Sequence, residues 1–425
     1  MVSFLALAAA IPTVAGIAQA IAGAWLTRRF AAQALLARGG TGAGATPPGV
    51  TVLKPLHGAE PLLEAALASC CAQDYPAFQV VFGVQRDDDP ALAVVERLRQ
   101  RFSTADLAVV VDPRRHGANP KVGNLINMLP AAKHDVLVIA DSDLHVAPDW
   151  LGRVVAALGT PGTGLVCTLY AGLPATGALV ERLAATQITH TFLPGAVLSR
   201  ALGRQDCLGA TMALRRETLV RIGGLEALVD HLADDNVLGR RVRALGLAVA
   251  LADTVPATTV PEATLPALWR HELRWARTIR ALVPGQFAAS VVQYPIAWAA
   301  LALALSGGAL WTWSLFETAW VTRALAARVI DRALAPLLEG LAFRAPLWLL
   351  PVRELLSVAV MLASYAGLTV DWRGDTLHAD DGGTDRFPGT LAREGRGEGV
   401  VGTISGAATP PPGPLPQGEG EDGTP

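Results

Sequence analysis

The chain has 425 residues, of which 51% are hydrophobic and only 17% are charged. Globular domains carry about 25% charged residues on average, so this composition excludes a disordered chain and argues against an ordinary soluble protein of this size. The 35 basic and 37 acidic residues give a net charge of −2. That balance offers no basic field for a nucleic acid. The four cysteines lack the spacing of a zinc site or a disulfide scaffold.

The first apolar segment lies at the N-terminus. Residues 1–27 carry no charged side chain, and Phe4–Leu26 is long enough to cross a bilayer, which takes about 20 residues. A cleaved signal peptide is the alternative, because small-residue cleavage sites are present. We favour a transmembrane anchor over residues 1–27, since Met1–Val2–Ser3 lacks a basic group. Arg28 and Arg29 follow the segment, so the positive-inside rule places the next domain in the cytosol.

Strands and helices alternate after a Gly/Pro-rich linker at residues 39–50. The apolar patterns predict strands at 52–56, 78–84, 107–111 and 136–140, and helices at 60–72, 89–101 and 120–133. This alternation predicts an α/β domain over residues 51–283, with a mixed, mostly parallel sheet covered on both faces. Ligands of such sheets bind at the carboxyl ends of the strands.

A second apolar zone follows this domain. It divides into residues 281–316, 318–342 and 345–370. We expect a membrane region of two or three segments over residues 284–370. The adjacent charges of Arg353 and Glu354 are costly at membrane depth unless they face a partner or a polar cavity, and an interfacial position is the alternative. Residues 380–425 are rich in Gly, Pro, Asp and Glu, which predicts a disordered tail.

The first acidic cluster, Asp87–Asp89, comes directly after the strand predicted at 78–84. A carboxylate at the tip of a strand is suited to binding a nucleotide base or ribose. The alternative is that the cluster caps the helix that begins near Pro90. Different residues of the cluster can serve each purpose.

The second cluster, Asp141–Ser142–Asp143, ends the apolar strand predicted at 136–140. Two carboxylates on one side of an extended turn suit a hard divalent cation such as Mn²⁺ or Mg²⁺, which leaves room for phosphate oxygens. A lone Asp-x-Asp motif is common, so the motif has this meaning only in combination with others.

The third cluster, Asp234–Asp235, opens a helical stretch at 237–245. A carboxylate in this position is a candidate general base. Helix capping and a favourable helix dipole are the alternative explanation.

An arginine stripe lies on the helix predicted over residues 265–283. Arg270, Arg274, Arg277 and Arg280 recur every three or four residues and therefore share one face. Arginines in this arrangement are suited to a diphosphate. The alternative is an interfacial helix whose arginines face anionic lipids.

Taken together, these features resemble the ceramide glucosyltransferase family of membrane glycosyltransferases. The resemblance covers about residues 52–372 and rests on TVLKPLHG (51–58), VQRDDDPA (84–91), GANPKVGNL (117–125), ADSDLHVAPD (140–149), CLGATMALRR (207–216), ADDNVLGRRV (233–242) and HELRW (271–275). It implies a GT-A catalytic domain flanked by transmembrane helices, and inverting transfer of a sugar from a UDP-sugar. The family's motifs are three spaced aspartates and a (Q/R)xxRW sequence.

The resemblance also implies roles for the three acidic clusters. The first aspartate of the pattern falls within Asp88–Asp89 and contacts the uridine. Asp141 is the second, and Asp143 supplies the other carboxylate on the side of a divalent cation. Asp235 is the third and deprotonates the acceptor hydroxyl, with Asp234 as the neighbouring candidate.

Further residues are assigned to the donor by the same resemblance. Arg274 and Trp275 match the end of the last motif, which holds the diphosphate and closes the site. Lys121 and Asn124 lie in the segment beside the nucleotide. His271 departs from the family, because Gln or Arg is usual there; histidine can still hydrogen-bond a phosphate.

The acceptor is expected to be a membrane lipid, with Phe192, Cys207 and Gly209 lining its entry. The 209–216 and 232–246 stretches look closest to the bacterial branch of hopanoid biosynthesis, which implies transfer of N-acetylglucosamine to bacteriohopanetetrol. Ceramide glucosylation is the alternative, and a processive polysaccharide synthase or a non-enzymatic scaffold are more distant ones. A multi-pass protein of the bacterial inner membrane is expected, with no obligate protein partner.

Overall fold

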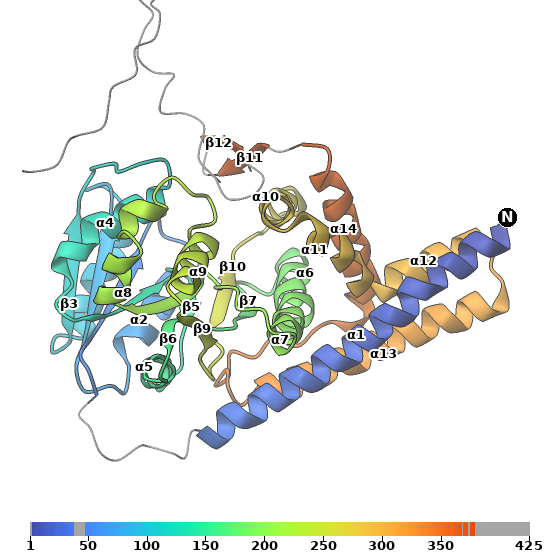
Figure 1. The fold of residues 1–425 in the computed structure, drawn as a ribbon, viewed down its shortest axis with the longest axis horizontal. Coiled ribbons are helices and arrows are strands. Elements are labelled where there is room, and N and C mark those ends of the chain that lie inside the picture. Colours follow the sequence, from blue (N-terminus) through green and yellow to red (C-terminus); the bar gives the residue numbers. More distant parts are fainter. Residues whose placement is uncertain (1, 38–46, 368, 373–374, 379–425) are drawn as a thin grey trace, which may run out of the picture. The chain divides into compact units, whose positions relative to one another are not determined.

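The structure is a computed structural model that describes residues 2–37, 47–367, 369–372 and 375–378 (Figure 1). Most of the predicted linker and the whole predicted tail at 380–425 lie outside the described residues. The predicted catalytic domain and the predicted membrane region belong to the same compact unit.

A seven-stranded sheet carries the domain, in the order β3-β2-β1-β4-β8-β6-β9. Its strands are β1 (Val50–Pro55), β2 (Phe78–Val84), β3 (Asp106–Val111), β4 (Val136–Ala140), β6 (Thr163–Cys167), β8 (Thr211–Arg215) and β9 (Ala248–Leu251). Only β8 runs antiparallel to its neighbours β4 and β6. The other pairs are parallel. The predicted α/β class with a mixed, mostly parallel sheet is confirmed.

Helices cover both faces of this sheet because alternate residues of its strands point to opposite sides. Val52 and Val80 pack in one core with α2 (Leu63–Cys71), α3 (Ala91–Arg101) and α5 (Trp150–Leu158). Leu53 and Val81 pack in the other with α4 (Pro120–Met128), α8 (Arg216–Arg221) and α9 (Asp234–Ala244). The central strands are therefore apolar at successive positions, which is why their sequences are continuous hydrophobic runs.

A small second sheet, in the order β5-β10-β7, adjoins the point where β4 ends. Its strands are β5 (Leu144–His145), β7 (Ala171–Pro174) and β10 (Ala257–Val260). After β7 the chain forms α6 (Leu179–Gln187), a π-helical turn at Ile188–Phe192 and α7 (Leu193–Ala201). The long helix α10 (Leu265–Leu282) follows β10. Apart from α10, where a helix was predicted over residues 265–283, this part of the chain was not predicted element by element.

Among the described residues, two helical segments are long and apolar enough to cross a membrane: Phe4–Ala37 and Leu347–Ser364. A third candidate is the pair Pro284–Gln293 and Pro295–Leu305, which is bent by 70°. The first lies in α1 (Val2–Ala37), which extends well beyond the predicted end of the anchor at residue 27. Phe4 and Ile11 on this helix are more than two-thirds exposed, as expected of side chains that lipid would cover.

The remaining C-terminal elements follow α10 along the chain. They are α11 (Pro284–Ala289), α12 (Pro295–Leu305), α13 (Leu310–Leu334) and α14 (Leu350–Ser364), followed by the strands β11 (Thr369–Trp372) and β12 (Asp375–His378). In Figure 1, α1 runs alongside α12 and α13, and these helices are in contact. The predicted segment 318–342 lies mainly in α13, which is not among the candidate spans of the described residues.

Gly172 in β7 offers a test of the packing between the small sheet and α6. A Cβ atom at this position would lie 2.6 Å from the backbone Cα of Ala185. We expect Gly172→Ala to destabilise the protein by about 1–3 kcal/mol, because backbone must move to relieve the clash. Thermal unfolding of the protein in detergent measures the effect.

Gly152→Ala in α5 is the matched control, because a Cβ there meets no atom within 4 Å. Alanine in a helix is more favourable than glycine by about 0.5–1 kcal/mol, so this variant should be slightly stabilised. Equal melting temperatures for the two variants would contradict the packing described here.

Candidate active site

The Asp141–Asp143 turn lies at the carboxyl end of β4, between the large and the small sheet. The Asp141 amide donates to the carbonyl of Ala210, at 3.1 Å. Asp143 accepts a hydrogen bond at Oδ2 from Thr258 of β10, at 2.6 Å. Burial, followed by the charge of Asp141, raises the pKa of Asp143. The two carboxylates are thus held close together at the edge where ligands of such sheets bind.

Two lysines compensate this negative charge. Lys54, fully buried at the end of β1, donates from Nζ to the main-chain carbonyl of Asp141 at 2.6 Å. Lys121 of α4 lies 2.7 Å from Oδ1 of Asp141 and 3.9 Å from Oδ2 of Asp234. Burial alone would lower the pKa of Lys121, but Asp141 and Asp234 together raise it, so this lysine stays charged. It connects the second and third acidic clusters.

Asp234 and Asp235 are the first two residues of α9, as the helix-dipole alternative expected, and Asp235 accepts at Oδ1 from the amide of Asn236 at 2.7 Å. Asp235 lies against Gly209, where a Cβ atom would come within 2.9 Å of its Oδ2. Burial, followed by the charge of Asp234, raises the pKa of Asp235 to about 7. Burial also raises the pKa of Asp234, against the effect of Lys121. A carboxyl that ionises near neutral pH is well suited to accept a proton.

The first cluster differs from the other two. Asp89 is buried and accepts hydrogen bonds from the amides of Gly58, at 3.0 and 3.1 Å, and Ala91, at 2.9 Å. Asp88 is exposed and pairs with Arg86, whose hydrogen bond lowers the pKa of Asp88. Asp89 therefore joins the loop after β1 to the start of α3, as the capping explanation held. The predicted contact of Asp88–Asp89 with uridine stays a prediction.

The α10 residues of the last motif share one face of that helix. His271 pairs through Nδ1 with Glu262, and its ring meets the ring of Trp275 edge-on, with centroids 4.5 Å apart. The Nε2 atom of His271 is buried and has no hydrogen-bond partner. Arg274 lies one turn along from His271, half-buried, and its carbonyl accepts from Thr278 at 3.0 Å. His271, Arg274 and Trp275 are thus brought together.

Asn124 of α4 contacts the end of β2. Its Nδ2 donates to the carbonyl of Gly83 at 2.8 Å, and its buried Oδ1 has no partner. A side chain at Gly83 would collide with Asn124 and Met128, so the glycine allows α4 to approach the strand closely. The predicted role of Asn124 beside a nucleotide stays untested.

The three residues predicted to line the acceptor entry are placed differently from one another. Gly209 adjoins Asp235, as described above. Phe192 packs its ring against Tyr170, with centroids 5.0 Å apart. Cys207 is the exception, because it is buried in the core and packs against Gly239 and Cys167. The prediction that Cys207 lines an accessible entry must be corrected, since its side chain faces the interior.

Lys54 and Tyr170 were not among the predicted site residues. Burial raises the pKa of Tyr170, as do the charges of Asp235, Asp141 and Asp143, so its hydroxyl stays protonated beside the carboxylates. A signal for Lys54 existed in the sequence, because it is one of only three lysines and ends the first strand. Tyr170 had no such signal, since it lies in a stretch whose elements were not predicted.

A divalent cation fits the chemistry of Asp141 and Asp143. In the described part of the chain, no group of three or more His, Cys, Asp or Glu residues has the geometry of a metal site. Mn²⁺ and Mg²⁺ bind through one or two carboxylates when phosphate oxygens and water complete the coordination. Two carboxylates on one turn therefore match a cation that arrives with a diphosphate, and not a permanent protein-only site.

Comparison with known proteins identifies similar chains. The sequence profile of Glycosyl transferase family 21 matches residues 8–385. Ceramide glucosyltransferase 1 of Caenorhabditis elegans is 22% identical over 80% of this chain and 74% of its own length. The ceramide glucosyltransferase of Komagataella phaffii is 37% identical over 114 residues, which make up 26% of this chain and 22% of that protein.

Among solved structures, the chain is similar to the mannosyltransferase PcManGT from Pyrobaculum calidifontis, in complex with GDP-Man and Mn²⁺. The identity is 21%, the match covers 86% of this chain and 99% of that one, and the TM-score is 0.49. The glucosyl-3-phosphoglycerate synthase from Mycobacterium tuberculosis is 20% identical, with coverage of 55% and 78% and a TM-score of 0.35.

The contribution of the buried Lys54 ammonium to the stability of the Asp141–Asp143 turn can be tested by Lys54→Met. We expect a loss of about 1.5–3 kcal/mol in the free energy of unfolding, because a charge-assisted hydrogen bond disappears and two carboxylates lose a compensating charge. Chemical or thermal unfolding in detergent measures it.

Lys133→Met is the control for Lys54→Met. Lys133 is an exposed lysine that pairs with Asp106 at 2.7 Å, and such surface pairs contribute about 0–1 kcal/mol. If the two lysine variants proved equally stable, Lys54 would have no special part in holding the turn.

Proposed function

Since the chain belongs to Glycosyl transferase family 21, the family of ceramide glucosyltransferases, we propose that it transfers a hexose from a UDP-sugar to the hydroxyl group of a membrane lipid. The observation that supports this proposal best is the half-buried Asp235, whose pKa is raised to about 7 beside the Asp141–Asp143 turn. A base and a candidate diphosphate site lie together there, and the chemistry needs both.

In the proposed reaction the acceptor hydroxyl gives its proton to the carboxylate of Asp235. The oxygen then bonds to the anomeric carbon, the bond from that carbon to the diphosphate oxygen breaks, and UDP leaves with the electron pair. One direct displacement inverts the anomeric carbon. Asp234 and Lys121 set the local field, because the charge of Asp234 raises the pKa of Asp235 and that of Lys121 lowers it.

The leaving diphosphate needs positive charge. A divalent cation held by Asp141 and Asp143 would neutralise part of the charge that develops on the diphosphate. Arg274 is proposed to bind the diphosphate from α10, and Trp275 to close over it. His271 is held by Glu262 through Nδ1, which leaves the buried Nε2 as the atom that can hydrogen-bond a phosphate oxygen.

As the acceptor, we prefer ceramide to the hopanoid that the 209–216 and 232–246 stretches of the sequence favoured. The curated relatives are ceramide glucosyltransferases, and the comparisons lend no support to a hopanoid substrate. We therefore propose UDP-glucose and ceramide as the first pair of substrates. The candidate membrane helices and the aromatic pair of Phe192 and Tyr170 near the carboxylates suit a lipid that approaches from the bilayer.

The proposal is tested with membranes that contain the protein. They are incubated with labelled UDP-glucose or UDP-N-acetylglucosamine, with ceramide or bacteriohopanetetrol, and with or without Mn²⁺ or Mg²⁺. Transfer of label to a lipid in the presence of the cation is the expected result. Labelled polymer in place of lipid would indicate a processive synthase. Intact protein that labels no lipid under any of these conditions would overturn the proposal.

Asp235→Asn should lower the turnover number by about a hundredfold to ten-thousandfold, the usual contribution of a general base, and leave UDP binding unchanged. Asparagine has nearly the same shape but cannot accept the proton. The measurements are initial rates at saturating donor and acceptor, and calorimetric titration with UDP. Near-normal turnover in this variant would move the base to Asp234 or to another group.

The pH dependence follows from the raised pKa of Asp235. The carboxyl must be ionised to accept a proton, so kcat/KM should rise with pH up to about 7 and level off above it. Below that value the rate should fall about tenfold per pH unit. A midpoint near the ordinary aspartate value of about 4 would show that Asp235 is not the group that limits the reaction.

A further inference from the structure

Two charged neighbours lie in the interior of a helix that is apolar enough to span a membrane. Arg353 and Glu354 of α14 are each only 1% exposed. Buried charges at membrane depth are tolerated when each has a partner. These two residues are adjacent in sequence, yet they pair with different parts of the chain.

Arg353 binds the helix that carries the last motif. Its Nη1 and Nη2 donate to the two carboxylate oxygens of Glu272 in α10, at 2.8 and 2.7 Å. Nη2 also donates to Ser357, at 3.0 Å, and Nη1 to the carbonyl of Leu183 in α6, at 3.4 Å. A bidentate pair of this kind fixes direction as well as distance.

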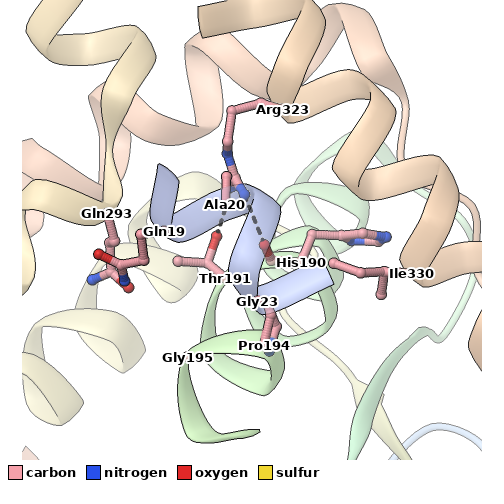
Figure 2. Close-up of a pocket in the computed structure, with 10 residues that line it drawn as sticks. All are labelled: Gln19, Ala20, Gly23, His190, Thr191, Pro194, Gly195, Gln293, Arg323 and Ile330. Atoms are coloured by element: carbon pink, nitrogen blue, oxygen red, sulfur yellow. Dashed lines mark hydrogen bonds between the residues drawn. The ribbon is translucent and has the colours of Figure 1, made fainter. Parts of the chain in front are cut away.

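Glu354 points to the other side of the bundle. It accepts from Arg323 of α13 at 2.7 Å, and from the amide of Ile296, at the start of α12, at 2.8 Å. Arg323 in turn donates to the carbonyl of His190 and to the hydroxyl of Thr191, at 3.1 and 3.2 Å, as the dashed lines in Figure 2 show. The π-helical turn that ends at Phe192 is therefore connected to Glu354 through Arg323.

The position of Glu272 on α10 gives its contact a consequence for the site. His271, Arg274 and Trp275 stand three and four residues apart, so they share one face of the helix. Glu272 is rotated by about 100° from His271 and faces α14. A rotation of α10 about its axis would displace all three motif side chains at once, and the Arg353 contact opposes that rotation.

We propose that Glu272 is a positioning residue for the transfer reaction: its pair with Arg353 sets the rotation of α10 and so places Arg274 and Trp275 at the diphosphate. The expected effect on turnover rests on the proposed function. The expected effect on the rotation of α10 rests on the contacts alone. A misplacement of about 1 Å in such a group can cost about a hundredfold in rate.

The test compares three variants by hydrogen–deuterium exchange and by kinetics. In Glu272→Gln we expect about tenfold faster exchange within residues 265–282, and a turnover number about tenfold to a hundredfold lower, with the acceptor KM within about threefold of its normal value. Arg153→Gln is the matched control. Arg153 is also a buried arginine with an acidic partner, Asp149, but it contacts α1 and not α10. Its exchange in 265–282 should be unchanged.

A double variant, Glu272→Gln with Arg353→Met, separates positioning from stability. Removing both charges of a buried pair is often neutral or stabilising, so this protein should fold even where Glu272→Gln alone does not. We expect its melting temperature to recover while its turnover number stays low. Recovery of turnover together with stability would overturn the inference, as would unchanged exchange in α10.

The exchange measurement uses no substrate, so it decides the structural part of the inference by itself. A wild-type protein that transfers no sugar would contradict the proposed function. Faster exchange confined to α10 in Glu272→Gln would still establish that the pair holds this helix.

Discussion

The site depends on the balance between clustered carboxylates and two lysines, of which Lys54 is buried and Lys121 is half-buried. Asp141, Asp234 and Asp235 converge at one edge of the sheet, where burial raises the pKa of Asp235 to about 7. Their mutual repulsion would protonate them further if Lys121 were not placed between Asp141 and Asp234. Lys54 acts from behind, through the carbonyl of Asp141. Because the lysines offset only part of the charge, the pKa of Asp235 stays raised to about 7, as its proposed role as a base requires.

Much of this arrangement could be predicted from the sequence. The strands at Phe78–Val84 and Val136–Ala140 have the predicted ends, and the helix Leu265–Leu282 ends one residue before the predicted end, because long apolar runs and a clear arginine stripe define them. The small sheet could not be predicted, since β5 has two residues and depends on pairing with β10, more than a hundred residues away in the chain. Short strands of this kind are set by tertiary contacts and carry little local signal.

The acidic clusters show the same limit at the level of single residues. All three follow or begin elements in the predicted way, yet the carboxylate of Asp89 also accepts from the amides of Gly58 and Ala91, which the sequence did not reveal. Cys207 is buried although it lies only two residues from Gly209, which touches Asp235. Sequence position places a residue near a site, but the direction of its side chain depends on packing partners such as Gly239, which no local pattern reveals.

The contacts within the C-terminal helices explain why Arg353 and Glu354 are charged in a chain that has so few charged residues. An arginine left alone in this interior would cost several kcal/mol, so α14 is stable in its place only when α10 and α13 bring Glu272 and Arg323 to it. The helix that carries His271, Arg274 and Trp275 and the turn that ends at Phe192 are thereby tied to one candidate membrane helix. The proposed donor and acceptor sides of the site then form together with the bundle, which suits the proposed lipid acceptor.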